Sequence, residues 1–400
     1  MTGLDLVLDR ATLPDGRVAS IGIGAGRIAA IVSDGGRLEE AEQRRDLGLS
    51  LVVPGLVDGH NHLDTTFFSD TWKPHRPCKA GFDVAERIAI QKELLEDTLP
   101  VGQRAGALVE LAVSHGTTHI RTHVEIDVDL GLSHLEGILG VRERYRDAVT
   151  IQIVAFPRGV IKVQGTLELL DEALKMGADV VGGLDPAGFD GDVDGHLDAI
   201  FGLADHYGVG IDIHLHDRGA LGLFELEEIA KRTRSLCMGG RVAVSHAYAL
   251  GDAARPVLDR AAAELADVGV AIMTNAPGDH PFPPVLLLRQ AGVTVFAGND
   301  DIRDSWWPYG DADMLERAML IGYRSGFYTD EELTVAFEMA SYRAADALGI
   351  TDYGLRVGDH ADLVVLGARN IPEVVVTRPK GRDVYKKGRL VAQNGRFCGS

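Results

Sequence analysis

The sequence predicts an α/β fold: a closed (β/α)8 TIM barrel with a small β-sandwich domain beside it. Eight short apolar runs end in polar or ionisable residues, stretches with helical periodicity lie between them, and both ends of the chain alternate apolar with polar residues. A doubly wound open sheet is the alternative. Such sheets seldom have eight regular parallel units, and no glycine-rich phosphate turn follows the first run, so we favour the barrel.

Both ends of the chain are expected to build the small domain. Residues 1–53 and 357–400 contain alternating segments such as "LDLVLDRATL" and "VYKKGRLVAQNG", separated by turn residues. This alternation is typical of strands with one buried face. Because one set precedes the barrel and the other follows it, we expect them to meet as one composite domain, which leaves residues 54–356 for the barrel.

The eight apolar runs supply the predicted barrel strands. In chain order they cover residues 55–64, 118–127, 150–158, 178–186, 210–217, 241–248, 269–276 and 292–301. From the second run onward their starts are roughly 23 to 32 residues apart, the length that one strand and one helix need. Helices are expected over segments such as 166–178 and 252–269, each closed by glycine.

The gap between the first and second runs is about twice the others. We therefore expect a long loop after the first strand. In a barrel, such a loop lies on the face that carries the active site.

Composition excludes several classes of partner. The 400 residues carry a net charge of −19, which works against binding to nucleic acid, and no run approaches the roughly 18 apolar residues of a membrane span. No secretory signal is visible at the start, and the three cysteines are too scattered for a disulfide framework. We expect a cytoplasmic protein that acts on a small molecule and assembles as a homo-oligomer.

Histidines and acids gather where the predicted strands end, which is where a parallel barrel places its chemistry. His60 and His62 are two residues apart on an extended segment, so their side chains face the same way and can hold one ion. Alone the pair is a weak signal, because hydrogen-bonded or exposed histidines are common. Together with His214 and Asp300, which end later strands, it forms a ligand set suited to zinc or iron, with manganese as a further option.

One metal ion is favoured over two. A barrel hydrolase with two metals often bridges them with a modified lysine, but no lysine ends the third or fourth run. A divalent ion held this way makes water a nucleophile at neutral pH. His246, at the end of the sixth strand, is placed to hold that water, and His123 is expected to support a ligand.

These residues stand in segments that resemble a known family. "VDGHNHLDTTF", "HIRTHVEID", "IQIVAFP", "LKMGADVVGG" and "DDIRDSWWPYGDADML" are similar to segments of the amidohydrolase superfamily, and within it of the cytosine deaminase group, which includes alkylaminohydrolases of s-triazines. The resemblance covers essentially the whole chain. It implies a mononuclear metal enzyme that removes an amino or alkylamino group from a nitrogen heterocycle of the pyrimidine or triazine type.

Carried over position by position, the resemblance gives roles to individual residues. It implies that His60, His62, His214 and Asp300 are the metal ligands and that His246 activates water. Asp217 falls where cytosine deaminase has a glutamate that protonates the ring nitrogen, and His216 could share that work. The alternative for both Asp217 and His216 is a hydrogen bond that orients His214.

Substrate contacts are expected from the ends of the third and eighth strands. Arg158 stands where the group has a glutamine; a guanidinium only donates, so the substrate should present carbonyl or carboxylate oxygens there. Alternatively Arg158 turns outward or pairs with Asp185 or Asp190.

Two further residues at the eighth strand are candidate contacts. Asp301 could accept a hydrogen bond from a substrate N–H, or instead cap a loop or pair with Arg303. Trp306 could stack on a flat ring, or simply pack against the rim.

Two other functions fit the same residues. Hydrolysis of a cyclic amide or imide uses the same metal chemistry but opens a ring. A metal-free binding protein that has lost activity would lack a ligand, and none is missing.

Overall fold

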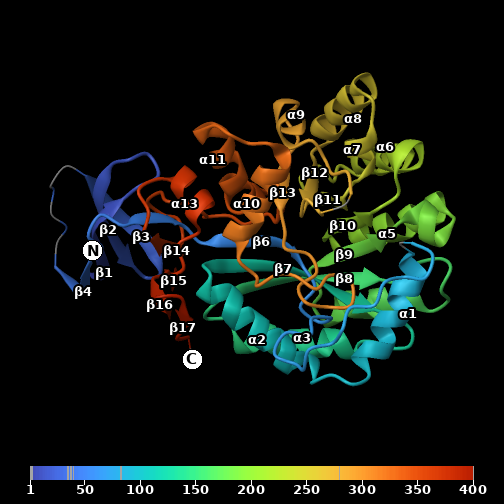
Figure 1. Ribbon diagram of the computed structural model, residues 1–400, viewed down its shortest axis with the longest axis horizontal. Coiled ribbons are helices and arrows are strands. Elements are labelled where there is room, and N and C mark those ends of the chain that lie inside the picture. Colours follow the sequence, from blue (N-terminus) through green and yellow to red (C-terminus); the bar gives the residue numbers. More distant parts are fainter. Residues whose placement is uncertain are drawn as a thin grey trace.

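The computed structural model describes residues 3–33, 36, 38, 40–81, 83–278 and 280–399. Two hydrogen-bonded sheets organise it, one of eight strands and one of nine. Figure 1 shows the first surrounded by helices and the second at one end of the molecule.

The eight-stranded sheet is a closed parallel barrel. Each predicted run coincides with one of its strands, and β7 begins one residue before its run. The strands are β6 (Leu56–Asn61), β7 (Thr117–Ile126), β8 (Thr150–Pro157), β9 (Val180–Leu184), β10 (Gly210–Leu215), β11 (Val242–His246), β12 (Val270–Thr274) and β13 (Val295–Ala297). They pair in chain order. The circle closes where Asn61 bridges Asp300 in parallel and the Asp300 backbone N–H donates to His60 O over 2.8 Å. The predicted barrel is confirmed.

Helices follow the strands and cover the barrel. They are α2 (Val101–Ser114), α3 (Ser133–Arg144), α4 (Thr166–Met176), α5 (Val193–Tyr207), α6 (Gly219–Ser235), α7 (Ala249–Asp252), α8 (Arg255–Val268), α9 (Val285–Gln290), α10 (Met314–Ser325), α11 (Asp330–Met339) and α12 (Tyr342–Ala347), with a π-helical turn η1 (Pro186–Asp190). Gly177 and Gly269 close α4 and α8 at φ of 111° and 71°, a left-handed conformation that glycine adopts freely.

The segment between β6 and β7 is not only a loop. It contains α1 (Val84–Leu95), which begins where the Asp83 side chain accepts from the Glu86 backbone N–H. The expectation of an extended loop was therefore incomplete, because "ERIAIQKELL" forms helix once Asp83 supplies the cap. Helix α1 places Gln91 beside the barrel mouth, where it becomes part of the cavity wall.

Strands from both ends of the chain form the second sheet, as Figure 1 shows for the blue and red segments. Its members are β1 (Leu4–Thr12), β2 (Val18–Gly24), β3 (Arg27–Ser33), β4 (Ala41–Asp46), β5 (Leu51–Pro54), β14 (Leu363–Leu366), β15 (Asp383–Lys386), β16 (Arg389–Gln393) and β17 (Arg396–Phe397). Leu8 and Ile21 share one core with Leu363 and Tyr385. Residues far apart in the sequence thus build one domain core.

The expectation of strands in residues 357–400 was wrong for one apolar run. The run "PEVVV" lies in α13 (Ile371–Thr377), because Asn370 accepts from the Glu373 backbone N–H and Pro372 sits in the first turn. Strand β5 ends at Pro54 and β6 begins at Leu56, but the domain division at residues 53/54 and 356/357 stays a prediction. Among the described residues, no helix is both long and apolar enough to cross a membrane.

Candidate metal centre and active site

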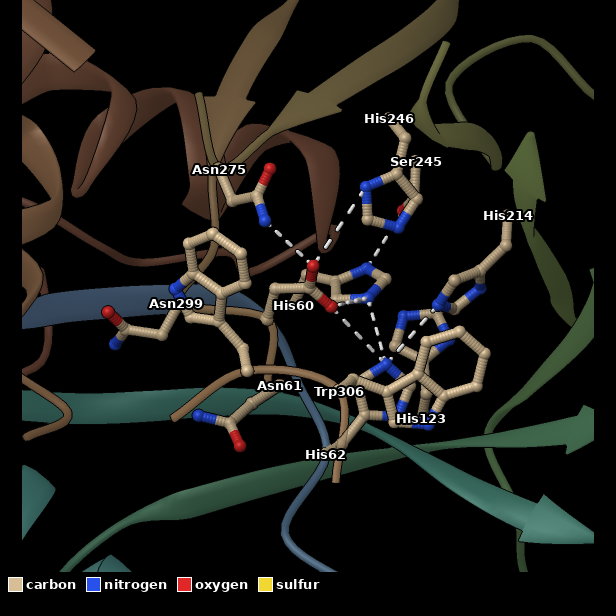
Figure 2. A network of polar contacts seen from close by, with 12 residues as sticks. His60, Asn61, His62, His123, His214, Ser245, His246, Asn275, Asn299 and Trp306 are labelled. Carbon is tan, nitrogen blue, oxygen red and sulfur yellow. Dashed lines mark hydrogen bonds and ion pairs between the residues drawn. The ribbon is translucent and has the colours of Figure 1, made fainter. Parts of the chain in front are cut away.

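Four side chains converge at the C-terminal ends of the barrel strands. His60 lies in β6 one residue before its end, His62 follows β6, His214 lies in β10 and Asp300 follows β13; all four are buried. The Nε2 atoms of His60 and His214 lie 3.3 Å from His62 Nε2, and Asp300 Oδ1 lies 3.3 and 3.4 Å from the Nε2 atoms of His60 and His62. Figure 2 shows the three imidazoles pointing toward one another.

These distances fit a single divalent cation. Ligand atoms at the corners of a tetrahedron with metal bonds of about 2.0–2.1 Å are separated by about 3.3–3.4 Å. The four atoms lie within 4.8 Å of one another. Two neutral imidazoles cannot both direct lone pairs at each other favourably, so a shared cation explains the cluster better than hydrogen bonds among its members.

A hydrogen-bond chain fixes the direction of the His60 lone pair. Ser245 Oγ donates to Asp212 Oδ1 over 2.8 Å and lies 2.8 Å from His60 Nδ1. Because the hydroxyl proton goes to Asp212, Ser245 accepts from the His60 Nδ1–H. This leaves His60 Nε2 without a proton and aimed at the site, as a metal ligand requires.

The carboxylate of Asp300 is held in place and charged. Burial alone would raise its pKa, but the adjacent imidazoles of His246, His60 and His62 bring the pKa well below its usual range. Asn275 Nδ2 donates to Asp300 Oδ2 over 2.7 Å. Both Asp300 and His246 have left-handed backbones, with φ of 62° and 72°, a cost of order 1–3 kcal/mol that proteins tolerate at functional sites.

His246 lies beside the ligand set with both ring nitrogens available. It is buried, its Nδ1 lies 4.0 Å from Asp300 Oδ2, and neither ring nitrogen has a hydrogen-bond partner among the described residues. Burial lowers the pKa of His246 well below its usual value, so the imidazole is neutral. His216 stacks on it at 4.5 Å between ring centres and bonds Asp185 Oδ2 through Nδ1 over 2.9 Å.

Known proteins are similar to this chain in sequence and in architecture. A model of the family described as "Amidohydrolase family" matches residues 45–392. The chain belongs to this amidohydrolase family.

Three relatives illustrate the similarity. This amidohydrolase is 41% identical to the N-isopropylammelide isopropylaminohydrolase of Burkholderia multivorans ATCC 17616, over 98% of this chain and 99% of that one, with a TM-score of 0.93. It is 32% identical to the N-isopropylammelide isopropyl amidohydrolase of Pseudomonas sp. (strain ADP), over 98% of both. A 5-methylcytosine deaminase from Klebsiella pneumoniae, liganded with phosphonocytosine, is 25% identical over 97% of this chain and 98% of that one, with a TM-score of 0.85. The predicted resemblance is confirmed.

The amidohydrolase centre opens into a cavity of about 620 Å³ at the barrel mouth. Of the residues expected to bind substrate or metal, those that line it are His62, His214, His216, His246, Asp300, Arg158, Asp301 and Trp306. Strand ends, the β13–α10 loop and α1 all contribute to the wall. This volume lies in the range of ordinary small-molecule sites.

Asp217 is turned away from this cavity. Its Oδ2 accepts from the Gly188 backbone N–H over 2.7 Å, and it is not among the residues that line the cavity. The position therefore does not support the expected role in catalysis. His216 is the residue of the pair that faces the site, since Asp185 accepts from both its backbone N–H and its ring.

Arg158 pairs with an acid that the sequence reasoning missed. Its Nη2 bonds Glu125 Oε1, whereas Asp185 holds His216 and Asp190 accepts from the Val160 backbone N–H. Asp301 is in the cavity wall, and burial together with Asp304 raises its pKa well above its usual value. The proposed partner Arg303 donates to Gly310 O instead.

Three further residues support the site; His123 was expected from the sequence, whereas Asp212 and Gln91 were not. His123 stacks on His60 at 3.9 Å between ring centres, and its Nε2 lies 3.6 Å from Asp212 Oδ2, which agrees with the expected supporting role. Asp212 stands two residues before His214 on the same strand, so the period of two places both inside the barrel. That spacing could have identified Asp212, while Gln91 comes from an insertion whose placement no local pattern gives.

Proposed function

We propose that the chain is a mononuclear metal-dependent hydrolase that removes an amino or alkylamino group from a nitrogen heterocycle of the pyrimidine or triazine type. The observation that carries this proposal is the convergence of four ligand atoms beside His246 at the base of a cavity. Relatives named for work on N-isopropylammelide and 5-methylcytosine support the substrate class.

His60, His62, His214 and Asp300 would hold the metal. Nitrogen and carboxylate ligands suit zinc or iron, with manganese as a third option. When bound, such an ion acts as a Lewis acid that makes water reactive at neutral pH. The chain's part is to fix the ligands, which Ser245 does for His60 and Asn275 for Asp300.

Two histidines would handle protons. His246 has both ring nitrogens without a described partner and lies 4.0 Å from Asp300, so it can hold the attacking water and accept its proton. His216 bonds Asp185 through Nδ1 and faces the cavity, so its other nitrogen can pass a proton to the departing amine. Carbon–nitrogen cleavage needs both transfers, one at the nucleophile and one at the leaving group.

Amine release tests this proposal. Protein loaded with zinc or with iron would be incubated with aminopyrimidines, alkylaminotriazines and pterins. Released ammonia or alkylamine and the absorbance of the ring would both be measured. We expect amine release from at least one ring, lost in His60→Ala and kept in His206→Ala, a change on the exposed face of α5. Loss of ring absorbance without amine would instead identify a ring-opening amidase and overturn the proposal.

A further inference from the structure

Arg158 is held rigidly in the cavity wall. It follows β8 and is 7% exposed. Its Nη2 bonds Glu125 and lies 3.4 Å from Gln91 Oε1, while the ring centres of Phe156 and Trp306 lie 5.0 and 5.3 Å from its Cζ. A guanidinium fixed by one acid and two aromatic rings loses little freedom when it binds a ligand.

Two acceptors beside Arg158, Gln91 and Glu125, are already engaged. Gln91 Nε2 donates to Glu125 Oε1 over 2.5 Å, and Gln91 Oε1 accepts from Trp306 Nε1. Glu125 is not among the residues that line the cavity. Both polar ends of Gln91 are therefore used inside the protein.

Arg158 keeps donors for a ligand. A guanidinium carries five N–H donors, and the bonds to Glu125 and Gln91 are made through Nη2. Because Arg158 lines the cavity, an oxygen of a bound ligand can meet the guanidinium there. Burial lowers the pKa of Arg158 only to about 10, so the guanidinium stays charged at neutral pH.

The wall adjoins the metal centre. Phe156, two residues before Arg158, stacks on His214 with 4.2 Å between ring centres. A ring held over the metal ligands would therefore direct one edge toward Arg158. An ionised oxygen on that edge would attract the charged guanidinium more strongly than a neutral lactam oxygen would.

We propose that Arg158 selects heterocycles that present an ionised oxygen at this edge over those that present a neutral lactam. This inference rests on the proposed function only in taking the same cavity as the substrate site. It deepens that function by favouring an anionic edge at this wall.

Two ligands that cannot lose an amine test the selection. Barbiturate and cyanuric acid have the same ring size and three oxygens each. At pH 6 barbiturate is an anion whose ionised edge has two oxygens flanking a C–H, whereas cyanuric acid is largely neutral and each of its oxygens lies between ring N–H groups. Calorimetry would give both dissociation constants for the metal-loaded wild type, for Arg158→Gln, and for Arg255→Gln, an exposed arginine on α8.

We expect the wild type and Arg255→Gln to bind barbiturate about tenfold or more tightly than cyanuric acid, and Arg158→Gln to bring the ratio near one. The paired variant Arg158→Gln/Glu125→Gln removes both charges, so the buried Glu125 is not left without its cation if the single variant folds poorly. A wild-type ratio near one, or a ratio that Arg158→Gln leaves unchanged, would overturn the inference.

The outcome separates this inference from the proposed function. If the protein releases amine but does not prefer barbiturate over cyanuric acid, the Arg158 inference is wrong and the proposed function stands. If the preference depends on Arg158 but no ring releases amine, the proposed function is wrong and the Arg158 inference stands.

Discussion

At the residue scale, the metal centre depends on the protonation of one imidazole nitrogen. His60 can ligate through Nε2 because the Ser245 hydroxyl oxygen accepts a hydrogen bond from the Nδ1–H, and Asp212 in turn orients the Ser245 hydroxyl. We expect Ser245→Ala to weaken metal affinity about 10- to 100-fold, since the supporting hydrogen bond is lost while every ligand stays. Competition with a chelator would measure this.

Ser235→Ala is the matched control, because Ser235 is exposed on α6 and its hydroxyl donates to Arg232 O within the same helix. Equal affinities in wild type and Ser245→Ala would show that the serine does not position His60.

Glu225, which is not one of the predicted metal ligands, should make the stability of the fold depend on pH. Burial and the charges of Asp217 and Asp185 raise its pKa to about 8. Between about pH 4.3, where an unfolded glutamate titrates, and pH 8, the folded state keeps a proton that the unfolded state has lost. Stability should therefore fall as pH rises through this window.

Glu225→Gln should remove that part of the fall while keeping an acceptor for the Ala187 N–H. Thermal unfolding midpoints from pH 5 to 9 would be compared with wild type and with Glu227→Gln, an exposed partner of Lys231. Parallel curves for wild type and Glu225→Gln would contradict the assignment.

Several residues of the site could be predicted from the sequence because the functional side chains of a parallel barrel lie at the C-terminal ends of its strands. His60, His62, His214, His246 and Asp300 each follow an apolar run, and the structure brings them together. Residues that act through another element could not be read this way. Which acid meets Arg158 depends on how β7 and β8 register, and the structure shows Glu125 beside it.

At the element scale, the barrel strands were predicted correctly, whereas helices α1 and α13 were not predicted. Strand runs carry their own signal, since their apolar residues are buried on both faces of a barrel sheet. Helix α13 is rich in β-branched residues, which favour strands, but Asn370 caps its N-terminus and it forms a helix. Helix α1 lies in an insertion that has no counterpart elsewhere in the repeating strand–helix pattern.

Helix α11 offers a test of capping. Thr329 accepts from the Glu332 N–H, and the Glu332 side chain accepts from the Thr329 N–H. We expect Thr329→Ala to lower the free energy of unfolding by about 1 kcal/mol, because the side-chain acceptor for the Glu332 N–H is lost while the backbone N–H of residue 329 stays. Urea denaturation would measure it.

Thr334→Ala, inside the same helix, is the control. The Thr334 hydroxyl donates to the Asp330 carbonyl within the helix, so alanine there should be neutral or slightly stabilising. Equal losses in both variants would argue against a specific cap.

At the scale of the whole molecule, a buried ion pair links the C-terminal segment to the barrel. Arg382 precedes β15, and its two terminal nitrogens donate to both oxygens of Asp313, the cap of α10, over 2.7 Å each. Both side chains are fully buried. Without Arg382 the buried Asp313 carboxylate would lose its bidentate partner, and the mostly exposed Lys380 lies farther away, with Nζ 3.8 Å from Asp313 Oδ2.

We expect Arg382→Ala to cost about 3–5 kcal/mol of unfolding free energy. Arg389→Ala, whose side chain is 62% exposed, should change little. Chemical denaturation of both would show whether the pair ties the two sheets, and a small loss in Arg382→Ala would indicate that it does not.

Metal stoichiometry tests the central claim most directly. Apoprotein would be titrated with zinc and with iron while bound metal and amine release are followed together in wild type, His60→Ala and His206→Ala. The account predicts that amine release saturates at one equivalent of metal per chain in wild type and His206→Ala, and that His60→Ala binds little metal and releases no amine. Full activity without metal, or unchanged binding in His60→Ala, would contradict it.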